Sequence, residues 1–169
     1  MRGVQNPSFF YEILLINAEH ISKLVQGKID GTDLFLVSVH VHPGNKIEVL
    51  LDSDNAFTID NCVEISRYLE SNLDRESEDF ALEVSSPGLT QPLKVKRQYV
   101  KNIQRDVIVK TKDGKKVEGT LAGVLGESIS LKMRVRETIE GTKKKAWVEK
   151  ELILPFEEIN ETKIVISFK

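Results

Sequence analysis

Histidine, cysteine and clustered carboxylates are the side chains of this sequence that could support catalysis or metal binding. Among the three histidines, His40 and His42 lie two residues apart in an apolar run, so a strand would place both on one face, where they could in principle hold a metal. A catalytic zinc needs three protein ligands, and no cysteine or further histidine lies nearby. The single cysteine, Cys62, falls on the expected buried face of a helix, where cysteine acts as a small hydrophobic residue. We therefore expect neither a metal site nor a cofactor.

Motifs for nucleophilic or phosphate chemistry are also absent from the sequence. Residues 85–88 (SSPG) place serines before a turn but lack the Gly-x-Ser-x-Gly elbow of a hydrolase. No glycine-rich phosphate loop occurs, and the carboxylates of residues 76–79 lie in a polar loop where solvation is the simpler role. The sequence therefore predicts a protein that is not an enzyme.

Cationic side chains in the second half of the chain are the candidates for contacts with RNA phosphates. The sequence contains neither the aromatic octamer of an RRM nor the Gly-x-x-Gly loop of a KH domain, so sequence-specific base recognition is not expected. Contacts with phosphates do not require such a motif. Trp147 and Phe168 fall in expected strands and are predicted to lie in the core. The candidate phosphate contacts are Lys94, Lys96, Arg97, Lys101, Arg105, Lys143, Lys144 and Lys145. For the last three, a solvated flexible turn is an equal alternative.

The two halves of the chain carry opposite charge. Residues 1–90 contain 6 Lys and Arg against 15 Asp and Glu, whereas residues 91–169 contain 18 against 11. A basic half suits a phosphate backbone, and an acidic half suits a basic protein. Drift in surface composition is the plainer alternative.

The hydrophobic periodicity of the first half predicts an acidic α/β sandwich over residues 1–90. Its order is helix, hairpin, helix and strand, over residues 8–26, 33–41, 46–52, 59–74 and 80–85. Gly27 is expected to end the first helix, and Thr58 to cap the second.

The second half, residues 91–169, predicts a small basic barrel of the SH3 or Sm-like type. A linker with a short helix occupies residues 91–104, and the helix itself is expected over 93–102. The expected strands cover residues 106–112, 115–125, 128–136, 146–154 and 162–168. A charged loop fills 137–145, and the fold class as a whole is α+β. The chain has no apolar run of membrane-spanning length, no convincing secretion signal and one cysteine, so we expect a cytoplasmic protein without membrane contact.

Two motifs make the sequence similar to one known family. The pattern D-x-C-x-x-x-S-R covers residues 60–67, and L-E-V-S-S-P-G-L covers 82–89. Together they resemble the RimP family of ribosome maturation factors, and the resemblance extends over most of the chain, weakest at residues 1–32 and 137–150. It implies a non-enzymatic, cytosolic assembly factor with an N-terminal α/β domain and a C-terminal SH3/Sm-like barrel. It also implies binding to the immature small (30S) ribosomal subunit, through small-subunit ribosomal protein twelve and rRNA.

The residues of the second motif have two interpretations: direct ribosome contact, or a rigid strand exit that fixes the interdomain angle. For Asp60, Ser66 and Arg67 the alternatives are helix capping, helix packing or exposed recognition. The residues concerned are Asp60, Ser66, Arg67, Glu83, Ser85, Ser86, Pro87, Gly88 and Leu89. An Arg67–Glu83 ion pair between helix and sheet edge would fit a structural role.

The chain departs from the family pattern at two places. Thr90-Gln91 replaces an acidic residue and arginine, which puts a charge contact there in doubt. Gln104-Arg105 replaces Gly-Arg and predicts a slightly different turn, because a positive φ is costly for glutamine.

Three functions remain open on the sequence. The leading one is a monomeric ribosome assembly factor. An Sm-like RNA chaperone acting on free RNA is the alternative and would require oligomeric rings. A hydrolase or transferase has no constellation of residues behind it.

Overall fold

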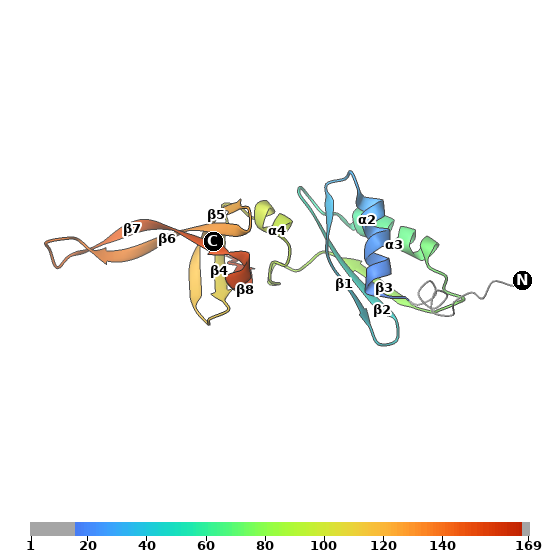
Figure 1. Ribbon diagram of the computed structural model, residues 1–169. Helices are drawn as coiled ribbons and strands as arrows, with labels where there is room; N and C mark the ends of the chain where they lie inside the picture. Colours follow the sequence, from blue (N-terminus) through green and yellow to red (C-terminus); the bar gives the residue numbers. More distant parts are fainter. Residues whose placement is uncertain (1–15, 167–169) are drawn as a thin grey trace, which may run out of the picture. The chain divides into compact units, whose positions relative to one another are not determined.

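The computed structural model describes residues 16–166, which form two compact units with their boundary between Pro87 and Gly88 (Figure 1). Each unit contains helices and a sheet, so the fold class is α+β. The expected helix start at residues 8–15 and Phe168 lie outside the described residues. Within residues 16–166 no helix is long and apolar enough to cross a bilayer.

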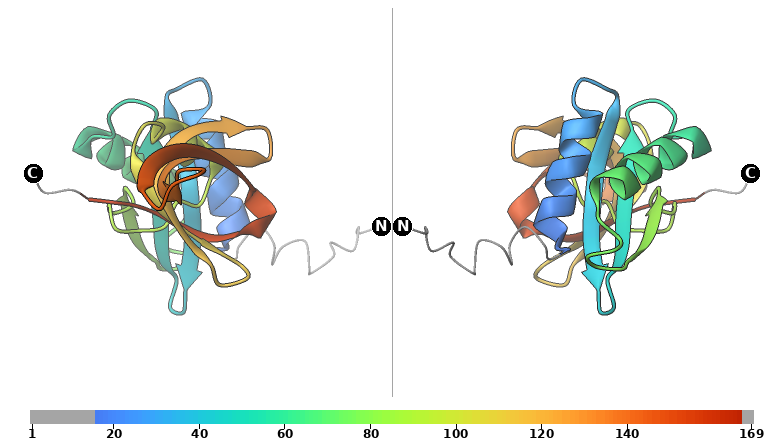
Figure 2. Two further views of the ribbon diagram at one scale, coloured as in Figure 1. Left: turned by 90° about the vertical axis from the view of Figure 1, so that its left-hand side faces the viewer. Right: turned by 90° about the vertical axis from the view of Figure 1, so that its right-hand side faces the viewer.

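The first unit is a three-stranded sheet with two helices on one face, as the right-hand view of Figure 2 shows. Its elements are α2 (Ala18–Ile29), β1 (Leu34–His42), β2 (Lys46–Ser53), α3 (Ile59–Asn72) and β3 (Ala81–Ser85). The strand order is β1-β2-β3, with β1 antiparallel and β3 parallel to the central β2. The parallel connection is made by α3, as a parallel pair requires a crossover.

Alternation along β2 builds the core of this unit. Side chains two apart in a strand share a face, and Ile47, Val49 and Leu51 are all fully buried. They pack against the apolar sides of the helices, where Ile21 of α2 and Ile65 of α3 are also buried. The polar residues between them, such as Glu48, lie on the other face of the sheet.

Local side chains set where the helices begin and end. The Thr58 hydroxyl accepts a hydrogen bond from the Asn61 amide N–H at 3.2 Å, and the Asn61 side chain accepts one from the Thr58 amide at 2.9 Å. This reciprocal capping box starts α3 and confirms Thr58 as its cap. The prediction that Gly27 ends the first helix is wrong, because α2 continues to Ile29. Gly31, with φ of 77°, provides the left-handed residue that follows.

The second unit is a five-stranded antiparallel sheet preceded by a short helix. Its elements are α4 (Lys96–Lys101), β4 (Asp106–Thr111), β5 (Lys116–Leu125), β6 (Ser128–Thr138), β7 (Lys145–Pro155), the 3-10 turn η1 (Phe156–Glu158) and β8 (Ile159–Ile164). The strand order is β7-β6-β5-β4-β8. Val107, Leu121, Ile129 and Leu131 are fully buried and form its core, with Tyr99 of α4 packed on them.

A closed barrel is not found in this unit. The two edge strands are β7 and β8, and no ladder joins them among residues 16–166. The last strand also begins at Ile159, three residues before the predicted start. The reason is that η1 leads directly into β8, whose first residue already pairs with Thr111.

The β6–β7 hairpin extends well beyond the rest of the sheet (Figure 1). The recorded β5–β6 register reaches Lys132, which pairs with Thr120, and β6 then pairs with β7 alone from Met133 to Thr138. Six residue pairs at about 3.4 Å each make this extension roughly 20 Å long. We call residues 133–150 the arm.

Candidate functional site

The first motif, D-x-C-x-x-x-S-R, lies on α3. Asp60 and Arg67 are exposed, and Ser66 is half-buried. A spacing of seven residues brings Asp60 and Arg67 to the same side of the helix. Ile59, in the same first turn, is 82% exposed, so this side of α3 combines charge with an uncovered apolar residue. Such a surface can contact a partner. The Asp60 carboxylate also lies in the first turn of α3, where it interacts favourably with the helix dipole.

Glu83 lies on the other side of the same unit. In the parallel register Glu83 pairs with Glu48, and both alternate with residues that face the helices. Glu83 is exposed on the helix-free face of the sheet, whereas Arg67 projects from α3. No ion pair joins the two in the described part of the chain, and the strand's alternation explains why the expected pair does not form.

The S-S-P-G-L segment leaves β3 and spans the boundary between the two units. Ser85 and Pro87 are half-buried, whereas Leu89 is 65% exposed. The Gln91 N–H donates to the Gly88 carbonyl at 3.0 Å, which closes a turn. Gly88 does not adopt a positive φ, and a Cβ there would meet only the Gln91 side chain at 3.8 Å. Local conformation therefore does not require glycine at this position.

The basic segment before and within α4 is held to the sheet by polar contacts at its base. The Leu93 N–H donates to the Thr162 carbonyl at 2.8 Å. The buried Gln98 side chain accepts from the Lys94 and Val95 N–H groups at 2.6 and 3.1 Å, which caps α4. The Tyr99 hydroxyl donates to Thr162 at 2.8 Å, and burial raises the pKa of Tyr99.

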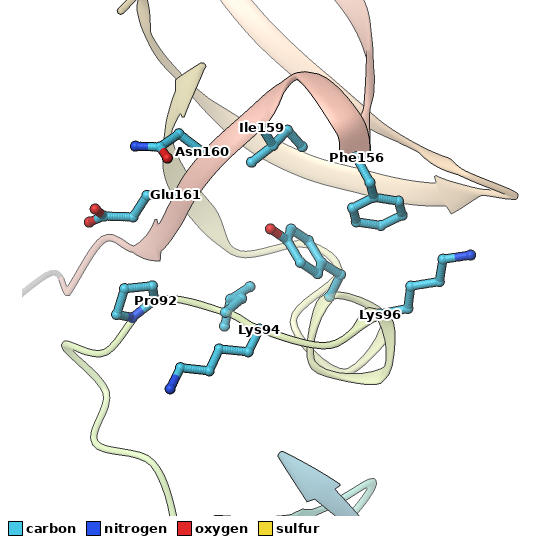
Figure 3. Close-up of a pocket in the computed structure, with 9 residues that line it drawn as sticks. Pro92, Lys94, Lys96, Phe156, Ile159, Asn160 and Glu161 are labelled. Carbon is cyan, nitrogen blue, oxygen red and sulfur yellow. The ribbon is translucent and has the colours of Figure 1, made fainter. Parts of the chain in front are cut away.

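Two of the candidate cations border a cavity of about 540 Å³ in this unit (Figure 3). Lys94 and Lys96 come from the segment entering α4, and Asn160 and Glu161 from β8 form the other wall. Lys96 also pairs with Glu127, and its ammonium lies 5.6 Å from the centre of the Phe156 ring. Lys94 is exposed and is the better placed of the two to meet an anion.

The predicted phosphate contacts do not form one patch. Lys94, Lys96, Arg97, Lys101 and Arg105 surround α4, and all are exposed. Lys143, Lys144 and Lys145 are also exposed, but they lie at the tip of the arm, at the far end of the unit from α4 (Figure 1). The second unit therefore presents two separate basic surfaces.

Gln104 adopts the backbone conformation that the sequence argued against. Its φ is 79°, in the left-handed region, and its N–H donates to the Leu121 carbonyl at 2.8 Å. The expectation of a different turn is therefore wrong: the hydrogen bonds on both sides, including Leu121 N–H to Arg105 at 2.9 Å, hold a glycine-like turn despite the glutamine.

The residues considered for catalysis are not assembled into a site within residues 16–166. His40 and His42 have ring centres 6.1 Å apart, and His42 Nε2 lies 3.7 Å from a Glu48 oxygen. No group of three potential metal ligands occurs there. Cys62 is half-buried, and burial raises the pKa of its thiol, which disfavours the reactive thiolate.

Trp147 is the residue that sequence reasoning misplaced. It was expected in the core, but its side chain is 61% exposed on the arm. The Arg134 and Arg136 guanidinium groups lie 6.0 and 5.7 Å from its ring centre. The available signal was the alternation of residues 130–136, which puts Ser130, Lys132 and the two arginines on one face of β6.

Comparisons with known proteins give one consistent result. The model of the RimP N-terminal domain matches residues 21–90. The ribosome maturation factor RimP of Christiangramia forsetii is 40% identical over 89% of this chain and 98% of its own length. The factor of the same name from Porphyromonas gingivalis is 40% identical over 90% of this chain and its whole length, and that of Flavobacterium psychrophilum is 38% identical over 86% and 94%.

Proposed function

Because the chain belongs to the RimP family of ribosome maturation factors, we propose that it binds the immature small (30S) ribosomal subunit and promotes its maturation without catalysing a reaction. The similarity over 89–90% of the chain to proteins named as ribosome maturation factors supports the role. It extends over both units, so the role belongs to the chain as a whole.

The observation that carries the subunit-binding proposal is the separation of charge between the two compact units. Residues 88–90 carry no charge, so the counts of 6 against 15 and 18 against 11 describe the units as well as the sequence halves. Opposite potentials in one chain suit a particle that presents both basic proteins and RNA phosphates. A free-RNA partner alone would leave the acidic unit repelled by its ligand.

We assign each unit a partner on this basis. The acidic unit would meet a basic ribosomal protein, with small-subunit ribosomal protein twelve as the candidate, through the exposed side of α3 around Asp60 and Arg67. The basic unit would meet rRNA phosphates through the cations around α4. The S-S-P-G-L segment would form a rigid exit from β3, and the exposed Leu89 would add an apolar contact with the partner.

The finer points of the fold belong to the same proposal. We treat the first unit as an α/β sandwich domain and the second as an SH3/Sm-like domain, with the boundary near residue 90. In the second unit the first strand, β4, lies between β5 and the last strand, β8, which supports this class. The protein would act as a monomer in the cytoplasm.

Co-sedimentation of the purified full-length protein with 30S subunits through a sucrose cushion tests the proposal. We expect binding that weakens as salt rises from about 50 to 200 mM, because binding releases cations from the RNA and that release is less favourable at higher salt. A strain lacking the protein should accumulate immature small subunits. The absence of co-sedimentation at low salt would contradict the proposal, and salt-independent binding would contradict its electrostatic part.

Charge reversal tests whether binding depends on the cations around α4 or only on the net charge of the second unit. The substitution Lys94→Glu reverses one exposed cation of the candidate surface and should weaken binding and flatten its salt dependence. Lys116→Glu is the matched control, because Lys116 is equally exposed but lies on β5, where it pairs with Glu118 at 3.7 Å. Equal loss in both variants would point to non-specific attraction.

A further inference from the structure

The arm is an ordered two-stranded ribbon, although isolated hairpins are marginal in water. Its tip is closed by hydrogen bonds from Ile139 N–H to the Lys144 carbonyl at 2.8 Å and from Thr142 N–H to the Ile139 carbonyl at 3.0 Å. Gly141 supplies the positive φ of 81° that this turn needs. The ribbon therefore holds its side chains on two defined faces.

One face of the arm concentrates cations around an aromatic ring. Arg136 pairs directly opposite Trp147 in the ladder, and Arg134 lies two residues away on the same face, opposite Glu149. Lys145, two residues before Trp147, extends this face towards the tip. Neither arginine has an ion-pair partner among the described residues, so both guanidinium groups keep hydrogen-bond donors free for a ligand.

The opposite face of the arm is different in kind. There Glu137 forms an ion pair with Lys150, and Val135 pairs with Val148 across the strands. This face neutralises its own charge and holds the ribbon together. The tryptophan face carries Arg134, Arg136 and Lys145 against Glu149, and the tip carries Lys143 and Lys144 against Glu140. The net positive charge of the arm, six Lys and Arg against three Glu over residues 133–150, therefore lies on the tryptophan face and the tip.

We propose that the arm binds single-stranded RNA, with an unpaired base stacked on Trp147 and the neighbouring phosphates held by Arg134, Arg136 and the Lys143–Lys145 tip. Single-strand binding sites combine exposed aromatic platforms with a basic track for the backbone, and stacking tolerates any base. This inference deepens the proposed function by assigning a second, stacking contact with rRNA that is separate from the cations around α4.

Charge and composition favour RNA over a protein partner on this face. A protein interface places apolar residues around a central aromatic residue, and its core is depleted of charge. The side chains around Trp147 on this face are Arg134, Arg136 and Lys145, against a single carboxylate, Glu149, which lies opposite Arg134. An acidic peptide could satisfy the cations but would not use the flat, exposed indole ring.

The indole is a direct probe, because Trp147 is the only tryptophan in the chain. We expect titration of the full-length protein with a short oligouridylate to quench its fluorescence, and a blunt RNA duplex to quench it much less. Trp147→Ala should weaken oligouridylate binding, measured by anisotropy of a labelled strand, by about 5- to 150-fold. Trp147→Phe should retain most of the affinity, because it keeps an aromatic face.

Ile139→Ala is the matched control, since it removes an exposed apolar side chain of the same arm and should leave affinity unchanged. Circular dichroism of each variant shows whether the fold is kept. Absence of quenching, or equal affinity of the alanine variant at position 147, would overturn the stacking proposal.

The same variants tested for 30S binding separate this inference from the proposed function. Subunit binding that persists without any quenching by oligouridylate would overturn the arm proposal alone. Quenching without subunit binding would overturn the proposed function and leave the arm proposal standing. Subunit binding that depends on Trp147, without oligouridylate quenching, would assign the arm to a protein and overturn the RNA proposal.

Discussion

Replacing Gln104 by glycine should stabilise the second unit. A non-glycine residue in the left-handed region pays about 1–2 kcal/mol, and Gln104 has φ of 79°. Glycine removes this strain but loses about 0.4–1 kcal/mol through the greater freedom of the unfolded chain. The Gln104 side chain is exposed and makes no recorded hydrogen bond within residues 16–166, so its removal costs little. The expected net gain is about 0.5–1 kcal/mol.

Hydrogen exchange of the amides of β4 and β5 measures this gain locally, which matters because two compact units can unfold separately. The Leu121 N–H, which is bonded to the Arg105 carbonyl, should exchange about 2- to 5-fold more slowly in Gln104→Gly under conditions where global opening controls exchange. Gln104→Ala keeps the Cβ and should give no gain. An equal gain in both variants, or none in the glycine variant, would refute the strain argument.

Asn45 is an informative contrast. Among residues 16–166 it is the other non-glycine residue with positive φ, at 56°. Its side-chain amide donates to Glu78 at 2.9 Å and to the Asp79 carbonyl at 3.1 Å. Asparagine tolerates this conformation better than glutamine, so the strain relieved by glycine would be smaller and the lost hydrogen bonds would dominate. Substitution by glycine is therefore expected to stabilise the protein at position 104 and to destabilise it at position 45.

Two further predictions concern α3. Thr58→Ala removes the hydroxyl of the capping box with Asn61 and should destabilise the first unit by about 1 kcal/mol, measured by hydrogen exchange in α3, whereas Thr58→Ser should restore most of it. Burial raises the pKa of the Cys62 thiol, so its rate of alkylation by iodoacetamide should reach half-maximum at a higher pH in the folded protein than in urea. At neutral pH the folded protein should therefore react more slowly, and coincident pH profiles would show that burial does not control this thiol.

Local sequence signals predicted most of the elements because local interactions create them. The Thr58 cap lies three residues from its partner, and the apolar alternation of β2 is visible without its neighbours. Errors fell where a boundary depends on residues distant in sequence. Gly27 is a typical helix terminator, yet tertiary burial of Ile29 against the sheet carries α2 past it. Likewise β8 begins early because its partner Thr111 is available there.

The exposure of the candidate contact residues could be predicted from their type, but their division into separate surfaces could not. Lysine and arginine are solvated in almost any fold, so exposure of Lys94 or Arg105 follows from chemistry alone. Their division between α4 and the arm tip depends on strand pairing, which no local pattern encodes. The expected Arg67–Glu83 pair, by contrast, fails because alternation along β3 places Glu83 on the face away from Leu82, Val84 and the helices.

Trp147 shows how the extent of a neighbouring strand decides the role of a residue. A tryptophan in a strand is buried when another layer covers its face, and the β5–β6 pairing that would place it near the core ends at Lys132. Close contact at that point is visible in Gly119, where a Cβ would lie 2.8 Å from the Lys132 carbonyl oxygen. Beyond it β6 and β7 have only each other, and burying the indole would require a partner from outside. The exposed indole with two guanidinium groups within about 6 Å of its ring centre is the feature on which the proposed stacking contact with RNA rests.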